Sequence, residues 1–139
     1  MNFKTVRAVH ATQASHINQV VLDTQSWESS AAFHLEELAR DGIVACYARN
    51  EGMGFAIPYE YLGVNHAYEP DFIVRLKDGS TLVLEIKGFE DNQTRAKHEA
   101  AQKWVRAVNA WGRLGQWRFH VCRDPATLSR EVSAILREP

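Results

Sequence analysis

The sequence has no long apolar run, few cysteines and no nucleotide-binding loop, and each absence excludes a class of protein. No stretch approaches the roughly 18 to 20 apolar residues of a membrane span, and residues 1–10 lack the apolar core of a secretory signal. Cys46 and Cys122 form no CxxC pair and have no Cys/His metal spacing. We therefore expect buried thiols in the cytoplasm rather than a disulfide or a zinc site. The missing G-x-x-x-x-G-K-[ST] loop excludes an ATPase motor within these residues.

A marked excess of charge is missing too. The net charge is −1, so composition alone does not indicate a nucleic-acid-binding protein. Residues 1–87 carry 7 basic against 11 acidic side chains, whereas residues 88–139 carry 9 against 6. The basic half is either a solvated helix face or a source of phosphate contacts. A domain this neutral is expected to depend on a neighbouring domain or subunit for much of its affinity for phosphates.

What the sequence does contain is typical of one globular domain over residues 1–139, with residues 1–14 as an extended lead-in. Hydrophobic periodicity and turn residues first predict a helix at 26–40, with Ser26 as N-cap, then strands at 43–49 and 55–61 and a turn at 61–65. Strands at 71–77 and 81–87 are predicted next, followed by a helix at 94–111 and a strand at 117–122. A last helix is predicted with Asp124 as its N-cap. This order predicts an α/β sandwich, in which a mixed sheet is flanked by helices.

A tight hairpin is predicted around Asp78-Gly79, a strong turn signal between two apolar strands. Because side chains alternate along a strand, Glu85 and Lys87 share one face. Positions 71 and 85 are equally distant from the turn, so we expect Asp71 to lie opposite Glu85. A buried acid and base need a partner or a metal to offset several kcal/mol of desolvation, so these charges predict a site.

Two carboxylates at adjacent strand ends are ligands suited to Mg²⁺ or Mn²⁺. The backbone carbonyl of Ile86 is a further candidate ligand. Lys87 is then placed to orient or deprotonate an attacking water, or to neutralise charge on the phosphorus. The alternative is structural: Asp71 and Glu85 as hairpin-end charges, with Lys87 in an ordinary surface salt bridge.

Pro70-Asp71, followed after the hairpin by Glu85-Ile86-Lys87, resembles the PD-(D/E)xK nuclease motif, and the predicted order resembles that superfamily's α-β-β-β-α-β restriction-endonuclease-like core. The resemblance extends to the C-terminal nuclease domain of type III restriction endonuclease-like proteins. It is carried by SHINQVVLDTQSWE (15–28), GFAIPYEY (54–61), YEPDFIVRL (68–76), LEIKGFE (84–90), RAKHEAAQKWVRAVN (95–109) and WRFHVCRD (117–124).

The resemblance implies that Asp71 and Glu85 are metal ligands and that Lys87 is the catalytic lysine. The superfamily often adds an acid from the first helix; Glu28 matches that position best, and Glu36 or Glu37 is the alternative. In these relatives the nuclease follows a helicase-like ATPase. ATP would therefore act only through such a separate domain or subunit, and the chain is either an excised domain or a stand-alone relative.

Three cations on the helix after the motif are candidate DNA contacts, because this helix can flank the active site in the fold: Arg95, Lys97 and Lys103. His66 is either a turn residue or a phosphate contact. Tyr59, Tyr61 and Tyr68 either line the cleft or pack. The four tryptophans fall on helix stripes and strands, and this pattern favours core packing over base stacking.

Together these features predict a Mg²⁺-dependent DNA endonuclease domain, the cleavage module of a restriction enzyme, with DNA as its partner. Cutting both strands of a duplex needs two active sites, so a homodimer or paired complexes are expected. Two alternatives remain open. One is a repair, recombination or transposon-end nuclease, and the other is a non-catalytic nuclease-fold module for DNA binding or assembly.

Overall fold

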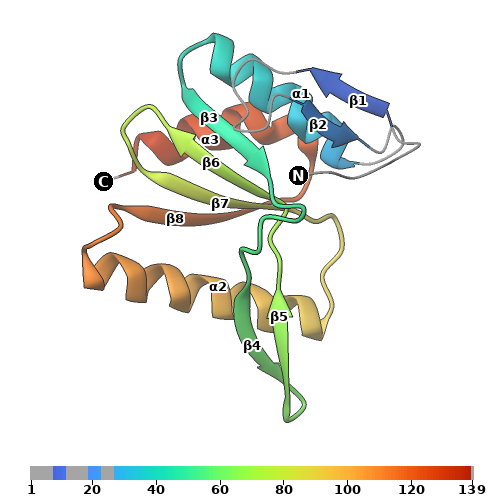
Figure 1. Cartoon of the computed structure of the whole chain (residues 1–139), viewed down its shortest axis with the longest axis vertical. Coiled ribbons are helices and arrows are strands. Elements are labelled where there is room, and N and C mark those ends of the chain that lie inside the picture. The colour runs from blue at the N-terminus through green and yellow to red at the C-terminus, as the bar shows by residue number, and fades with distance from the viewer. Residues whose placement is uncertain (1–7, 12–18, 23–26, 139) are drawn as a thin grey trace.

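The computed structural model describes residues 8–11, 19–22 and 27–138, with side chains from residue 27 onward except that of Glu28 (Figure 1). Its elements are β1 (Ala8–Ala11), β2 (Gln19–Leu22), α1 (Trp27–Arg40), β3 (Val44–Arg49), β4 (Ile57–Tyr61), β5 (Val64–Tyr68), β6 (Phe72–Leu76), β7 (Thr81–Ile86), α2 (Asn92–Trp111), β8 (Trp117–Cys122), the 3-10 helix η1 (Pro125–Thr127) and α3 (Leu128–Leu136).

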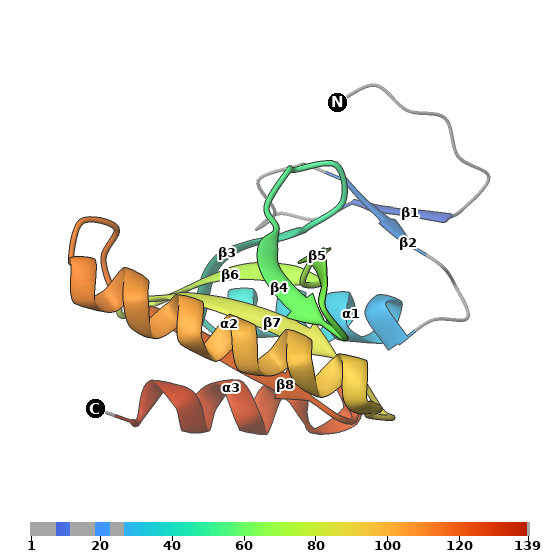
Figure 2. The same ribbon diagram turned by 90° about the horizontal axis from the view of Figure 1, so that it is seen from below.

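The main sheet has four strands in the order β3-β6-β7-β8. β6 pairs antiparallel with both β3 and β7, whereas β8 pairs parallel with β7 after the crossover through α2. α1 and α3 cover one face of this sheet and α2 covers the other (Figure 2). The prediction of a mixed α/β fold with helices on both faces of the sheet is therefore confirmed.

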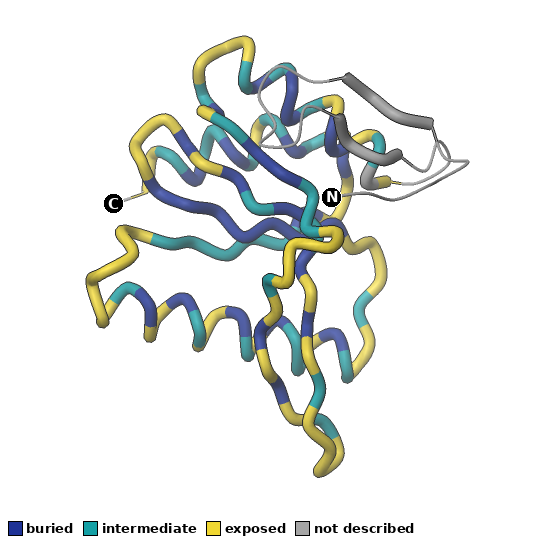
Figure 3. The backbone as a smooth tube through the Cα atoms, in the orientation of Figure 1, coloured by how far each residue is buried: buried dark blue, intermediate teal, exposed yellow. Residues whose placement is uncertain are grey.

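β7 is the most enclosed strand, because all six of its residues are buried (Figure 3). Leu82, Leu84 and Ile86 point into the main core, which α1 and α3 close. By strand alternation Val83 and Glu85 point to the opposite face, toward α2. A carboxylate thus occupies a position on this central strand where an apolar residue is expected.

The β6–β7 hairpin forms as predicted. The Asp78 carboxylate accepts hydrogen bonds from the backbone N–H and the hydroxyl of Ser80, at 2.9 and 2.6 Å. Gly79 adopts a φ of +88°, which a residue with a side chain rarely reaches. The register pairs Phe72 with Leu84, and one step further along it brings residue 71 opposite residue 85.

The second hairpin differs from the prediction. The predicted strand 55–61 starts only at Ile57, and the predicted turn is confirmed at Leu62-Gly63, where both residues have positive φ. The chain then forms β5, which we did not predict because VNHAY has no clear apolar alternation. Among the described strands, β4 and β5 pair only with each other, and their hairpin crosses over α2 outside the four-stranded sheet (Figure 1).

Several boundaries also move. Segments 8–11 and 19–22, the first of them in the predicted lead-in, pair as the antiparallel strands β1 and β2, while Ser26 lies outside the described residues. α2 starts two residues early, because the Asp91 side chain accepts a hydrogen bond from the N–H of Thr94 at 2.7 Å. Asp124 caps η1 rather than an α-helix.

Two further expectations concern the cysteines and membrane spans. Cys122 is buried as predicted, but Cys46 is only half-buried. Within the described ranges, no helix combines the length and apolar character needed to cross a bilayer.

Leu84→Ala tests the central position of β7. Leu84 is completely buried, so its truncation should lower the free energy of unfolding by about 2–5 kcal/mol. Leu114→Ala, in the exposed segment after α2, is the matched control and should change it by less than about 0.5 kcal/mol. Urea denaturation measures both, and equal effects would contradict the assignment of β7 as the core strand.

Candidate active site

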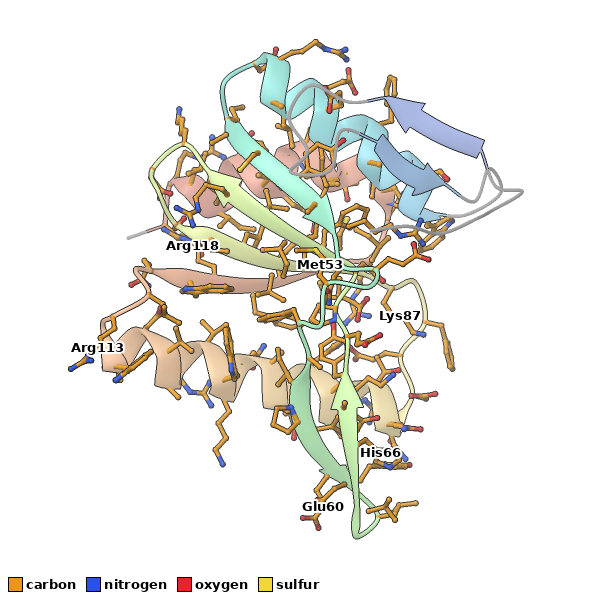
Figure 4. The ribbon with its side chains drawn as sticks, viewed as in Figure 1. Met53, Glu60, His66, Lys87, Arg113 and Arg118 are labelled. Atoms are coloured by element: carbon orange, nitrogen blue, oxygen red, sulfur yellow. The ribbon has the colours of Figure 1, made fainter. Side chains whose placement is uncertain are left out.

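Four elements meet at the carboxyl end of β7 and enclose a cavity of about 390 Å³. They are the end of β7, the start of β6, the base of β5 and the first turns of α2. The cavity is lined by Ala67, Tyr68, Glu69, Asp71, Glu85, Ile86, Lys87, Thr94 and Lys97. Figure 4 shows Lys87 at this end of the sheet, next to the base of the β4–β5 hairpin. The structure therefore brings Asp71, Glu85 and Lys87 into one place.

Asp71 is held by the strand that faces it. Its Oδ2 atom accepts a hydrogen bond from the backbone N–H of Ile86 at 2.9 Å. This bond fixes the carboxylate at the point where β6 begins and β7 ends, so its position follows from the hairpin register. The Asp71 carboxyl group also shares a hydrogen bond with the Glu85 side chain, so the two acidic groups are in direct contact.

Glu85 is the buried member of the pair, with 9% of its surface exposed. Burial, followed by the hydrogen bond and the negative charge of Asp71, raises its pKa to about 9, while Tyr68 and Lys97 act in the opposite direction. The raised pKa favours the protonated form of Glu85 at neutral pH. A second full negative charge in this place requires a compensating cation.

Tyr68 is the site residue whose role the sequence left undecided. It comes from β5, is buried, and its hydroxyl donates a hydrogen bond to Oε2 of Glu85. Burial, followed by the charge of Glu85, raises the pKa of this phenol, so it remains a hydrogen-bond donor. The direction of its side chain depends on the pairing of β5 with β4, which local sequence signals did not predict.

Lys87 lies one residue beyond β7, so the predicted strand 81–87 ends one position short. Its backbone N–H still bonds to the carbonyl of Cys122 at 2.9 Å, which continues the ladder with β8. Its side chain is exposed and lines the cavity. The hydrogen bonds from Thr94 lower the pKa of Asp91, and the charges of Lys87 and Lys97 lower it further.

The three helix cations separate in space. Lys97 lines the cavity, with its Nζ atom 5.9 Å from the centre of the Tyr68 ring. Arg95 is exposed and bonds instead to Asn92 at 3.2 Å. Lys103 lies in another groove, of about 530 Å³, between β4 and α2. Only Lys97 among the three is thus at the cavity.

The acids of α1 do not complete the site among the described side chains. Glu36 is buried on the opposite face of the sheet, where the Tyr47 hydroxyl donates to it at 3.0 Å. Glu37 bonds to His34 at 3.2 Å. Glu36 and Glu37, the two alternatives to Glu28, are therefore both engaged away from the cavity. The side chain of Glu28 itself lies outside the described part of the structure. The start of α1 does reach the site, since Trp27 contacts Gly88.

The predictions for His66 and the tryptophans have different outcomes. His66 stacks on Tyr59 with ring centres 5.2 Å apart, which accounts for it structurally. Two tryptophans, 104 and 117, pack against each other as predicted. The core-packing interpretation is wrong for Trp27 and Trp111, the first residue of α1 and the last residue of α2, which are 47% and 59% exposed.

The donor set indicates what the cavity can bind. Asp71 and Glu85 supply carboxylate oxygens, and Ile86 adds a backbone carbonyl close by; oxygen ligands of this kind suit Mg²⁺ or Mn²⁺. Among the described side chains, no group of three or more His, Cys, Asp or Glu residues is arranged so that all of them could hold one metal ion. Lys87 and Lys97 border the pair, so an anionic group can approach beside the carboxylates.

Glu85→Gln tests the protonation of this pair. Because the pKa of Glu85 is raised in the folded state, its proton is kept between about pH 5 and 9 while the unfolded chain loses it, so stability falls as pH rises through this window. Glutamine cannot ionise and still accepts a hydrogen bond from Tyr68. In EDTA the variant should match the parent near pH 5 and exceed it by about 1–3 kcal/mol near pH 8.

Urea denaturation across this pH range gives the comparison, with Glu99→Gln at an exposed position of α2 as background. An advantage of the Glu85→Gln variant that does not grow with pH would mean that Glu85 is already ionised in the folded protein at neutral pH.

Comparison with known proteins found no match for this chain. No protein-family model matches the chain, and neither a curated protein nor a solved structure matches it. The assignment of a function is therefore argued from the residues of the site.

Proposed function

We propose that this chain is a metal-dependent DNA endonuclease domain with a restriction-endonuclease-like fold, and that it hydrolyses phosphodiester bonds as the cleavage module of a restriction enzyme. The supporting observation is the pairing of Asp71 with Glu85 at the end of the β6–β7 hairpin, beside Lys87 in one cavity. Such a pair on a buried sheet face weakens the fold, so its presence favours a role in chemistry.

The metal in this proposal is Mg²⁺ or Mn²⁺, held by Asp71, Glu85 and the carbonyl of Ile86. The donor chemistry fits the ion, because all three groups are oxygen donors. Burial and the nearby Asp71 raise the pKa of Glu85, so its negative charge is unfavourable there, and a bound cation would offset that charge. When bound, the ion would polarise a phosphoryl oxygen and lower the pKa of the attacking water. Glu28 remains the proposed fourth catalytic residue, contributed from the start of α1.

The chain's own residues supply positioning and charge. Asp71 is fixed by the N–H of Ile86, and Glu85 by the hydroxyl of Tyr68. Lys87 reaches the cavity from the rim, where it orients the water or neutralises charge that develops on the phosphate. Lys97 provides a second cation for a phosphate oxygen.

DNA binding in this proposal is shared with a partner. Lys97 contacts the phosphate at the site, while Arg95, in the first turn of α2, and Lys103, near its middle, are exposed and contact neighbouring phosphates. Because the net charge is −1, a helicase-like ATPase domain or a second copy of the chain would contribute further affinity.

A cytoplasmic location agrees with the buried Cys122 thiol, whose pKa is raised to about 11, mainly by burial.

Separate substitutions distinguish metal binding from the later chemistry. Asp71→Asn keeps an acceptor for the N–H of Ile86 but loses a charged ligand, so we expect it to lose both Mn²⁺ binding and cleavage. Lys87→Ala should keep Mn²⁺ binding and lose cleavage by about 10²- to 10⁴-fold. Calorimetric titration with Mn²⁺ and nicking of supercoiled plasmid with Mg²⁺ or EDTA measure the two properties.

Lys77→Ala is the matched control, since this exposed lysine lies at the opposite end of the same hairpin. The nicking assay includes the natural ATPase partner wherever one accompanies the chain. Lys87→Ala that cuts as fast as the parent would refute the role of this lysine. A parent assembly that never cuts with any divalent metal would favour the non-catalytic alternative.

A further inference from the structure

Two large aromatic side chains are exposed next to Lys87. Phe89, two residues after the lysine, is 76% exposed, and Trp27, at the start of α1, is 47% exposed. They come from segments far apart in the sequence, but Trp27 lies against Gly88, the residue that precedes Phe89. Exposed aromatic rings lose favourable burial, so two of them close to Lys87, which lines a charged cavity, indicate a surface with a binding role.

The position of Trp27 depends on the missing side chain at Gly88. A Cβ atom at this glycine would lie 2.4 and 2.5 Å from two ring carbons of Trp27, far inside contact distance. The indole therefore lies directly against the backbone that follows Lys87. This close approach keeps the ring beside Gly88, the residue that follows Lys87 of the cavity lining.

The segment that carries Phe89 is short and anchored at both ends. At its start, the N–H of Lys87 bonds to Cys122, and at its end Asp91 caps α2. Between them Glu90 bonds to Arg123 and to His98, each at 3.0 Å. Phe89 is therefore presented outward from a fixed loop, which reduces the entropy that binding would cost.

We propose that Trp27 and Phe89 form a stacking platform for an unpaired nucleobase next to the scissile phosphate, so that the preferred substrate is DNA with a single-stranded segment at the cut site. This inference rests on the proposed hydrolysis of phosphodiester bonds and specifies the substrate. A preference for such DNA would favour the repair or recombination alternative over a restriction enzyme, which cuts duplex DNA. Two residues span at most about 7 Å, and the chain bends at Gly88, so Phe89 lies within one nucleotide's reach of a phosphate at Lys87. Aromatic rings stack on any base, whatever its identity.

The nucleobase is favoured over a protein partner by what surrounds the rings. Lys87 and Lys97 line the adjoining cavity and suit a phosphate, and a nucleotide joins a phosphate to a flat apolar ring. In an intact duplex the bases are stacked on their neighbours and cannot reach a platform beside the backbone. A fork, a flap or a single strand provides a free base without the cost of unpairing it.

Binding in EDTA measures the platform separately from cleavage. The full chain is titrated at low salt against a forked DNA and a blunt duplex of the same sequence, with fluorescence anisotropy as the readout. The parent should prefer the fork by about fivefold or more, the low end of the contribution of one stacked base. Phe89→Ala and Trp27→Ala should remove this preference, whereas Phe89→Tyr and Trp27→Phe, which keep a ring, should retain it.

The matched control is Trp111→Ala. Trp111 is also exposed, but it lies under Arg113 at the far end of α2 from Lys87 (Figure 4), and a helix of this length spans about 30 Å. This variant should keep the preference for the fork. A 5-iodouracil at the first unpaired position should form a photo-crosslink to Phe89 or Trp27, and mass spectrometry maps the attached peptide.

Three results of the binding experiments would overturn the platform. These are equal binding of fork and duplex by the parent, equal losses on both DNAs in the alanine variants, and a change of oligomeric state on Phe89→Ala, which would identify a protein interface. Cleavage by the parent without a preference for the fork refutes the platform alone. A preference in EDTA from a chain that never cuts supports the platform and refutes the nuclease.

Discussion

The antiparallel register of β6 and β7 determines where every part of the site lies. The Asp78-Gly79 turn sets this register, and one additional step beyond Phe72 and Leu84 brings Asp71 and the end of β7 together. A slip of one residue would exchange the two faces of β7 and move Glu85 into the apolar core. The same slip would expose the leucines that α1 and α3 cover, so packing of the core and placement of the carboxylates support one another.

The site exists at the expense of local stability. Glu85 replaces an apolar residue on the central strand, and its desolvation is only partly offset by the hydrogen bond from Tyr68 and the charge of Lys97. Elsewhere β7 follows the pattern of a buried strand without exception. A buried charged residue at one end of a strand that is otherwise buried throughout is typical of functional positions.

The parts of the fold that depend on neighbouring residues could be predicted from the sequence. The β6–β7 hairpin belongs to this class, since its turn and alternation are local, and so does the meeting of Asp71 with Glu85. β5 could not be predicted, because it is stabilised by β4 and α2 rather than by its own residues, and the orientation of Tyr68 depends on it. The exposure of Trp27 follows from the position of α1 relative to the sheet, which helical periodicity does not contain.

The candidate site spans two units that differ in cooperativity. Asp71, Glu85 and Lys87 belong to the four-stranded sheet or directly adjoin it, whereas Tyr68 belongs to a two-stranded hairpin that packs mainly against α2. Two-stranded hairpins are marginally stable alone, and such units open more often than the core to which they are attached. When this hairpin separates from α2, the hydroxyl leaves Glu85 while the rest of the sheet stays folded. We therefore expect local opening of β4 and β5, more than global unfolding of the domain, to limit the fraction of time for which the Tyr68 hydroxyl holds Glu85.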